Sequence, residues 1–252
     1  MTADGVTPVE AAPQVADLFP GNRVDVRRVI AHRGHRASLL AEEQTATSEM
    51  APRRVDEFAS ARAAARAALV AVAPAAVAAI PRGPQRQPLW PTGITGAITH
   101  TRGHCLAAVA LRSSPENSSG DFVIGLDAEE RDRVSARVAR RILVDTEHER
   151  LAVIVDADER QRLVAATFGL KEAFYKAHHQ LEPRYLGFDV VEVQIDGDGN
   201  ASFASTGVEL AADPASEVSG RVTEIDGRMI AAVWIRQRVR STSDRSRVPS
   251  AP

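Results

Sequence analysis

The sequence predicts a fold of mixed helices and strands, α/β or α+β, arranged as two halves of similar length. Two long segments have helical composition, and several short segments are rich in β-branched and apolar residues. A loop rich in Ser, Asn and Pro, at residues 112–121, is the best candidate for the boundary between the halves. No short-period repeat is apparent.

The first half contains one expected helix and one expected hairpin. Residues 57–72 are rich in Ala, Arg and Leu and run without a breaker until a proline, which is typical of a helix. Several Pro and Gly residues at 81–91 then impose a loop. Residues 94–101 and 105–111 are predicted strands, and an Arg-Gly pair supplies the turn between them.

The second half is predicted to begin with the strand FVIGLDAE at residues 122–129. A helix is expected over residues 158–179, with Gly169 as a potential interruption. FDVVEVQI, ASFAS and RMIAAVWI are three further predicted strands, and the last is apolar on both faces, as a central strand is.

Both ends of the chain have the composition of disordered tails. Residues 1–15 and 238–252 are polar and lack hydrophobic periodicity. We therefore expect an N-terminal half over residues 16–113 and a C-terminal half over residues 114–237.

The composition excludes several kinds of protein. The 31 basic residues nearly balance the 33 acidic ones, so nucleic acid and anionic membranes are not expected as partners. Cys105 is the only cysteine, which precludes an intrachain disulfide and fits a reducing compartment. The chain starts without the features of a signal peptide, and no apolar run is long enough to span a bilayer. We expect a cytoplasmic protein.

Two carboxylates end the predicted strand of the second half. Asp127 and Glu129 are two residues apart, so on an extended strand they face the same way. Carboxylates held together repel each other until a cation such as Mg²⁺ lies between them. A strand end where acidic side chains meet solvent is the simpler alternative, and the sequence alone does not separate the two.

The later predicted helix carries the segment LKEAFYK. Glu172 and Lys176 share one helical face, whereas Lys171 points about a quarter-turn away. One interpretation is that Glu172 completes a metal site or acts as a base while the lysines bind phosphate oxygens. The other is an ordinary ion pair on the surface of the helix.

Further candidates for binding phosphate lie in the first half. A histidine and a threonine end a predicted strand, and arginines occur near the predicted helix and in the Pro/Gly loop; each has a structural or solvent-exposed alternative. These residues are Thr99, His100, Arg54, Arg62, Arg66, Arg82 and Arg86. The motifs of phosphate loops, nucleophile elbows, zinc sites and dinucleotide-binding turns are absent from the sequence.

Taken in order, these segments resemble the phosphopantetheinyl transferases of the larger, pseudo-dimeric kind that activate siderophore, polyketide and nonribosomal peptide synthetases. The resemblance covers roughly residues 38–195 and rests on two motifs. They are a G-[IL]-D-x-E strand, here Gly125 to Glu129, and a K-E-x-x-x-K helix, here Lys171 to Lys176. The resemblance implies an α+β fold of two similar halves related by pseudo-twofold symmetry, with a cofactor cleft between them, and we expect a monomer.

The resemblance also implies roles for the candidate residues. Asp127, Glu129 and Glu172 would bind Mg²⁺, with Mn²⁺ as the alternative ion, together with the diphosphate of coenzyme A, and Glu172 is a candidate base. Lys171 and Lys176 would contact phosphates. The nucleotide end of coenzyme A would be held by Arg54, Arg62, Arg82, Thr99 and His100, with His100 at the 3'-phosphate.

The implied reaction is transfer of the 4'-phosphopantetheine arm of coenzyme A to a serine of an acyl or peptidyl carrier protein, with release of adenosine 3',5'-bisphosphate. The alternatives are a Mg²⁺-dependent phosphohydrolase on a similar substrate and an inactive coenzyme A-binding protein. Ala97, Gly169 and Leu170 depart from the family pattern, which prefers serine at the first two positions and a small residue at the third. None of these departures removes an expected metal ligand.

Overall fold

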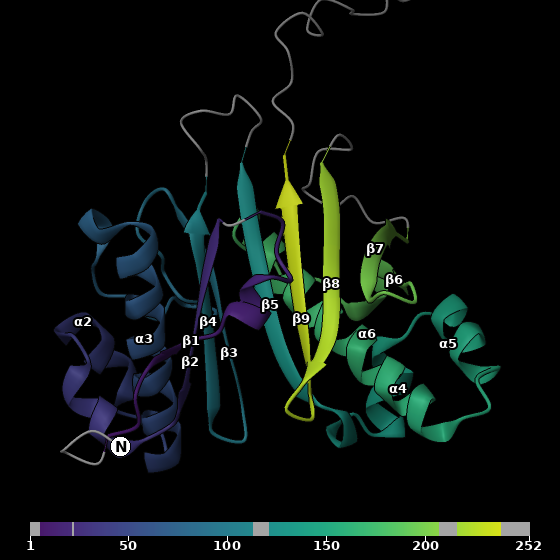
Figure 1. The fold of residues 1–252 in the computed structure, drawn as a ribbon, viewed down its shortest axis with the longest axis horizontal. Coiled ribbons are helices and arrows are strands. Elements are labelled where there is room, and N and C mark those ends of the chain that lie inside the picture. The colour runs from purple at the N-terminus through teal and green to yellow at the C-terminus, as the bar shows by residue number, and fades with distance from the viewer. Residues whose placement is uncertain (1–5, 22, 113–120, 207–215, 238–252) are drawn as a thin grey trace, which may run out of the picture.

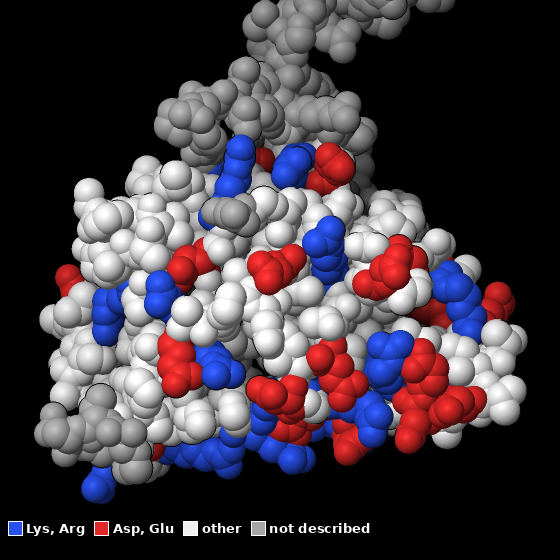
Figure 2. Space-filling view, viewed as in Figure 1, with Lys and Arg blue, Asp and Glu red and all other residues white. Residues whose placement is uncertain are grey.

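Two antiparallel sheets stand side by side, and a long helix packs on each of them (Figure 1). The structure is a computed structural model, which describes residues 6–21, 23–112, 121–206 and 216–237. No helix in these ranges is both long enough and apolar enough to cross a membrane. Acidic and basic side chains are interspersed over the face seen in Figure 1, with basic ones gathered along its lower edge (Figure 2).

The first sheet has the strand order β1-β2-β4-β3. Its strands are β1 (Glu10–Ala11), β2 (Val24–Ile30), β3 (Ile94–Thr101) and β4 (His104–Leu111). The helices of this half are α1 (Pro13–Ala16), α2 (Ala41–Gln44) and α3 (Pro52–Val72), with 3₁₀ turns at Arg33–Ser38, Thr45–Thr47 and Pro74–Ala76.

The second sheet has the strand order β5-β9-β8-β7-β6. Its strands are β5 (Phe122–Glu130), β6 (Val191–Ile195), β7 (Asn200–Ser205), β8 (Glu217–Ile225) and β9 (Arg228–Arg236). The helices are α4 (Ala136–Ile142), α5 (Asp145–Ala152) and α6 (Ala157–His178), with 3₁₀ turns at Arg131–Arg133 and Phe188–Val190.

The two long helices reach their sheets through small residues. On α3, the fully buried Ala64, Ala65 and Ala68 let the helix approach the first sheet closely. On the second sheet, a Cβ atom at Gly125 of β5 would lie 1.8 Å from the carbonyl oxygen of Ala173 on α6, so only glycine fits there. This contact places the side chains of α6 directly over those of β5.

The expected interruption of the second helix at Gly169 is wrong. Helix α6 is continuous, and Asp156 caps its start by accepting hydrogen bonds from the amides of Asp158 and Glu159, at 2.8 and 3.1 Å. A Cβ atom at Gly169 would stand only 3.3 Å from that of Ala231 on β9. The glycine therefore serves close packing of helix on sheet.

The halves have the same connectivity. In each, a strand leads to a long helix, and a hairpin follows whose last strand pairs with the first strand: β2-β4-β3 in one half and β5-β9-β8 in the other. This repetition agrees with the expected α+β fold of two similar halves. The rotation that would relate them stays a prediction.

The halves meet where β3 runs along β5. The hydroxyl of Thr95 accepts a hydrogen bond from the amide of Ile124 at 3.0 Å, and that of Thr99 accepts one from the amide of Ala128 at 3.3 Å. Side chains of one edge strand therefore satisfy backbone donors of the other. The junction is a polar seam beside the apolar core between the sheets.

Most of the expected elements are confirmed, with several corrections. The helix expected over residues 57–72 starts earlier, at Pro52, and β9 is central in its sheet, as expected. Strands β2 and β8 were not predicted, because charged residues and Gly220 interrupt their apolar pattern. Residues 6–15 are ordered, contrary to the expected tail over 1–15, since Ala12 and Val15 are buried in the core between the sheets. The tail at 238–252 and most of the boundary loop lie outside the described residues.

Candidate active site

Asp127 is the centre of the polar cluster at the seam between the halves. Its side chain is buried, and one carboxylate oxygen, Oδ1, accepts hydrogen bonds from Thr99 Oγ1 at 2.9 Å and from Lys176 Nζ at 2.6 Å. Its other oxygen, Oδ2, is buried without a hydrogen-bond partner in the described part of the chain. A buried carboxylate oxygen left unpaired is costly unless a further ligand takes it.

Glu129 and Glu172 flank Asp127 from β5 and α6. Burial and, after it, the charge of Asp127 raise the pKa of Glu129 to about 7, while Arg133 opposes the shift. Burial also raises the pKa of Glu172; Lys176 opposes this and Asp127 adds to it. The three carboxylates therefore act on one another electrostatically, as the sequence analysis expected of a shared site.

The three carboxylates do not by themselves form a closed metal site. Within the described ranges, no three His, Cys, Asp or Glu side chains are arranged as a ready metal centre. Mg²⁺, however, commonly uses one or two protein carboxylates together with substrate phosphates and water. The unpaired Asp127 Oδ2 is a hard donor of the kind that such an ion prefers, so this residue fits it; the participation of Glu129 and Glu172 stays a prediction.

Lys176 joins the cluster as predicted, but Lys171 does not. Lys176 also donates to the carbonyl oxygen of Leu126 at 3.1 Å. Lys171 is fully buried, and its ammonium group reaches Glu147 at 2.8 Å and the carbonyl oxygens of Ile142 and Phe188 at 2.8 and 2.9 Å. Because these contacts use all of its donors, the expected phosphate contact of Lys171 does not fit this structure.

Thr99 has a different role from the predicted one. Its hydroxyl donates to Asp127 and accepts from the amide of Ala128, and its side chain is buried. It therefore holds the carboxylate of Asp127 in place and leaves no donor for a nucleotide phosphate.

The side chains of His100, on β3, and Arg54 are in contact with each other. Arg54, on α3, contacts the ring of His100 through Nη1, and both side chains are partly exposed. Burial lowers the pKa of His100, and the charge of Arg54 lowers it further while Glu57 opposes the shift. The two residues form the basic position expected for a terminal phosphate.

Two other arginines that were predicted to bind the nucleotide, Arg62 and Arg82, have different surroundings from Arg54 and His100. Arg62 is only 4% exposed, its Nε donates to the carbonyl oxygen of Ile80 at 2.6 Å, and its guanidinium lies 4.2 Å from the ring centre of Phe58. Burial lowers its pKa to about 10. Arg62 is thus part of the core of the first half, and its predicted nucleotide contact is not supported. Arg82 lies half-buried in the loop before β3, close enough to influence the pKa of Arg62.

A cavity of about 1050 Å³ opens beside the cluster around Asp127, between the two halves. Loop residues before β3 form one wall and the end of α6 with the segment after it forms the other. Its lining includes Arg86, Trp90, Tyr175, Lys176, His179 and Tyr185. Lys176 thus contacts Asp127 and also lines a cavity of the size that small-molecule ligands occupy.

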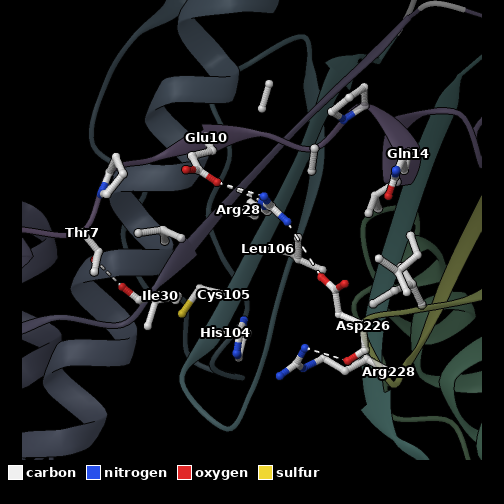
Figure 3. A pocket seen from close by; sticks show the side chains of 18 residues that line it. Thr7, Glu10, Gln14, Arg28, Ile30, His104, Cys105, Leu106, Asp226 and Arg228 are labelled. Carbon is white, nitrogen blue, oxygen red and sulfur yellow. Dashed lines mark hydrogen bonds and ion pairs between the residues drawn. The ribbon is translucent and has the colours of Figure 1, made fainter. Parts of the chain in front are cut away.

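A smaller cavity of about 480 Å³ lies between the N-terminal segment, the first sheet and the β8–β9 turn (Figure 3). Arg28 stands between two acids there, 3.0 Å from Glu10 and 3.9 Å from Asp226. Through Arg28, these ion pairs connect the N-terminal segment to the first sheet and to the β8–β9 turn of the second half. Asp127, by contrast, has a buried carboxylate oxygen without a hydrogen-bond partner among the described residues and lies next to the larger cavity, which makes the cluster at the seam the better candidate site.

Comparisons with known proteins identify the family of this chain. A model described as the 4'-phosphopantetheinyl transferase N-terminal domain matches residues 41–110, and the 4'-phosphopantetheinyl transferase superfamily model matches residues 123–232. The 4'-phosphopantetheinyl transferase Npt of Nocardia iowensis is 35% identical over 162 residues, which are 64% of this chain and 68% of that protein. This chain belongs to the 4'-phosphopantetheinyl transferase family.

Two further matches have lower sequence identity to this chain. The 4'-phosphopantetheinyl transferase Svp of Streptomyces mobaraensis is 30% identical over 165 residues, which cover 64% of this chain and 62% of Svp. Among solved structures, holo-[acyl-carrier-protein] synthase of Thermotoga maritima has 24% sequence identity and a TM-score of 0.39, over 51% of this chain and 76% of that one.

One residue of the site escaped the sequence analysis. Glu57 lies on α3 beneath Arg54 and His100, and its side chain is 12% exposed. Its spacing of three residues from Arg54 was the available signal, but this spacing also describes common surface pairs.

Proposed function

We propose that this protein transfers the 4'-phosphopantetheine arm of coenzyme A to a serine of an acyl or peptidyl carrier protein, releasing adenosine 3',5'-bisphosphate. The observation that carries the proposal is the cluster at the seam, where Asp127 and Glu129 of β5 meet Glu172 and Lys176 of α6 beside the larger cavity. The proposal includes action in the cytoplasm as a monomer.

The serine hydroxyl would attack the β-phosphorus of coenzyme A. The bond from this phosphorus to the bridging oxygen breaks, and that oxygen leaves with adenosine 3',5'-bisphosphate. Such transfers depend chiefly on positioning and on offsetting the negative charge. Glu172 is suited to take the serine proton, because burial raises its pKa above that of an ordinary glutamate.

The remaining residues hold the diphosphate and the ion. Asp127 Oδ2, Glu129 and Glu172 would hold Mg²⁺, which when bound neutralises charge on the phosphate oxygens. Thr99 fixes the orientation of Asp127, and Lys176 adds a cation next to the cavity. Arg54 and His100 would hold the 3'-phosphate.

The test is the mass of a purified apo carrier protein, measured before and after incubation with this protein, coenzyme A and Mg²⁺. We expect a gain equal to the mass of the phosphopantetheine group, which EDTA abolishes. An unchanged carrier together with free phosphopantetheine in solution would identify a phosphohydrolase. Bound but unconsumed coenzyme A would identify an inactive binding protein.

A further inference from the structure

Glu57 occupies an unusual place for a residue of a helical ion pair. Its carboxylate lies 3.2 Å from Arg54 Nη1, 3.5 Å from Arg53 Nε and 3.4 Å from His100 Nε2. The two arginines are neighbours on α3, but His100 belongs to β3. The carboxylate therefore connects the helix to the strand that forms the seam with the second half.

An ordinary surface pair does not explain these contacts. The side chain of Arg53 is 79% exposed, and a pair with so exposed a partner contributes little to stability. The side chain of Glu57 is only 12% exposed, so the carboxylate has lost most of its hydration. Its compensation comes from Arg54 and His100, which are the residues placed at the proposed phosphate position.

The carboxylate of Glu57 helps to hold Arg54 and His100 next to each other. Both are donors of the kind that binds phosphate, and Arg54 contacts the ring of His100 directly. Burial and the charge of Arg54 lower the pKa of His100, because this charge repels a proton on the ring and so opposes the protonated form that binds a phosphate best. A carboxylate in contact with both offsets the repulsion and fixes their mutual orientation before the ligand arrives.

We propose that Glu57 is a positioning residue, which holds Arg54 and His100 as a pair for the 3'-phosphate and thereby sets the preference for coenzyme A over dephospho-coenzyme A. The inference rests on the proposed function, since that function places the 3'-phosphate at these two residues. It adds a residue that touches no substrate atom and acts through its two partners.

The test compares two nucleotides that differ only in the 3'-phosphate. Calorimetry would measure the binding of adenosine 3',5'-bisphosphate and of adenosine 5'-monophosphate to the full chain and to Glu57→Gln. We expect the bisphosphate to bind about tenfold more weakly to the variant, because an orienting contact between charged groups is lost, while binding of the monophosphate is unchanged. Glu57→Asp should recover part of the loss.

Glu42→Gln is the matched control, because Glu42 is an exposed acid of the same half that makes no side-chain ion pair in the described ranges. It should leave both affinities as they are. Tighter bisphosphate binding by Glu57→Gln would show that Glu57 competes with phosphate, and equal loss for both nucleotides would show a structural role; either result overturns the inference. The measurement needs no carrier protein and no transfer, so its outcome is distinct from failure of the proposed reaction.

Discussion

The two halves share one structural device and differ in their chemistry. In the first half, the buried Glu43 of α2 accepts hydrogen bonds from the amide of Leu40 at 3.1 Å and from Arg66 of α3 at 2.6 Å. In the second, the buried Glu147 of α5 accepts one from the amide of Val144 at 2.9 Å and pairs with Lys171 of α6 at 2.8 Å.

Each of these glutamates also secures a distant segment. Glu43 accepts from the amide of Ile80 at 2.9 Å, and Glu147 accepts from the amide of Val193 at 2.7 Å. A single buried carboxylate thus caps a short helix, pairs with a cation of the long helix and satisfies a further backbone donor. The device occurs once in each half, which supports a scaffolding role for Lys171 as for Arg66.

The acidic residues of the site have no such counterparts. Asp127 pairs across the sheet with Ala231, and the position with the same relation to the hairpin turn in the first half is Arg27, which pairs with Ala107. By the same register Glu129 corresponds to Val29. The repeated architecture supplies the framework, and the carboxylates proposed to bind the metal belong to the second half.

The largest effect on transfer activity is expected from substitution of Asp127. Asp127→Ala should reduce transfer to a carrier protein by about 1,000-fold, because it removes the unpaired oxygen and the partner of Lys176 together. Arg27→Ala, its counterpart, should keep the activity, since Arg27 contacts Asp25 of its own strand. The rate of phosphopantetheine incorporation into carrier protein is the measurement. Comparable losses in both variants would contradict the division of labour between the halves.

The next largest effect is on stability and concerns the cations that pair with the buried Glu147 and Glu43. Lys171→Met leaves the carboxylate of Glu147 buried without its cation, so the free energy of unfolding should fall by about 3–5 kcal/mol. Arg66→Met should cost less, because the side chain of Arg66 is 14% exposed whereas that of Lys171 is fully buried, so water can reach the position that the guanidinium leaves. Urea unfolding at neutral pH measures both.

Lys171→Arg tests the same point by retaining the charge. If Lys171 is structural, the free energy of unfolding should recover at least in part, and the affinity for coenzyme A of the folded fraction should equal that of the original protein. A stable Lys171→Met protein with weakened coenzyme A binding would instead restore the phosphate contact predicted from the sequence.

The motif in the sequence located the site but could not separate the two roles that it contains. Asp127, Glu129, Glu172 and Lys176 come together as predicted because strand and helix periodicity determine which faces they share. Lys171 is adjacent to Glu172 in the chain, but the helix turns it toward α5, and its partner Glu147 carries no recognisable signal. Whether a cation near a motif faces the cavity or the core depends on packing between distant segments, as Arg62 also shows.

A smaller effect is expected from pH in the metal-free protein. The pKa of Glu129 is raised from 4.5 to about 7, so its contribution to stability is fully present below pH 4.5 and is lost as the pH rises through 7. Glu129→Gln removes this titration. In EDTA, the difference in unfolding free energy between pH 5 and pH 7.5 should therefore be smaller in the variant, by about 1–2 kcal/mol after allowance for solvent screening.

Val29→Gln provides the comparison in the first half, at a position that carries no carboxylate to titrate. Its pH dependence should match that of the unsubstituted protein. Equal pH dependence in the Glu129→Gln and unsubstituted proteins would show that the pKa of Glu129 is not raised in the folded protein, which contradicts this prediction.

The smallest effect concerns the residue that lets α6 approach its sheet. A Cβ atom at Gly169 would lie 3.9 Å from the unpaired Asp127 Oδ2 and 3.3 Å from the Cβ atom of Ala231. Gly169→Ser places a hydroxyl within reach of this oxygen and adds helix propensity, so the metal-free protein should gain about 1 kcal/mol in unfolding free energy.

Gly169→Ala separates the two contributions, because it adds helix propensity without a donor. If the hydroxyl reaches Asp127, serine should stabilise more than alanine even though alanine is the better helix former. The long helix of the first half has Ala64 at the position corresponding to Gly169 when Arg66 is matched with Lys171, and Ala64 is fully buried. A Cβ atom is therefore accommodated in that half, and destabilisation by both substitutions at Gly169 would mean that α6 lies too close to β9 for any side chain there.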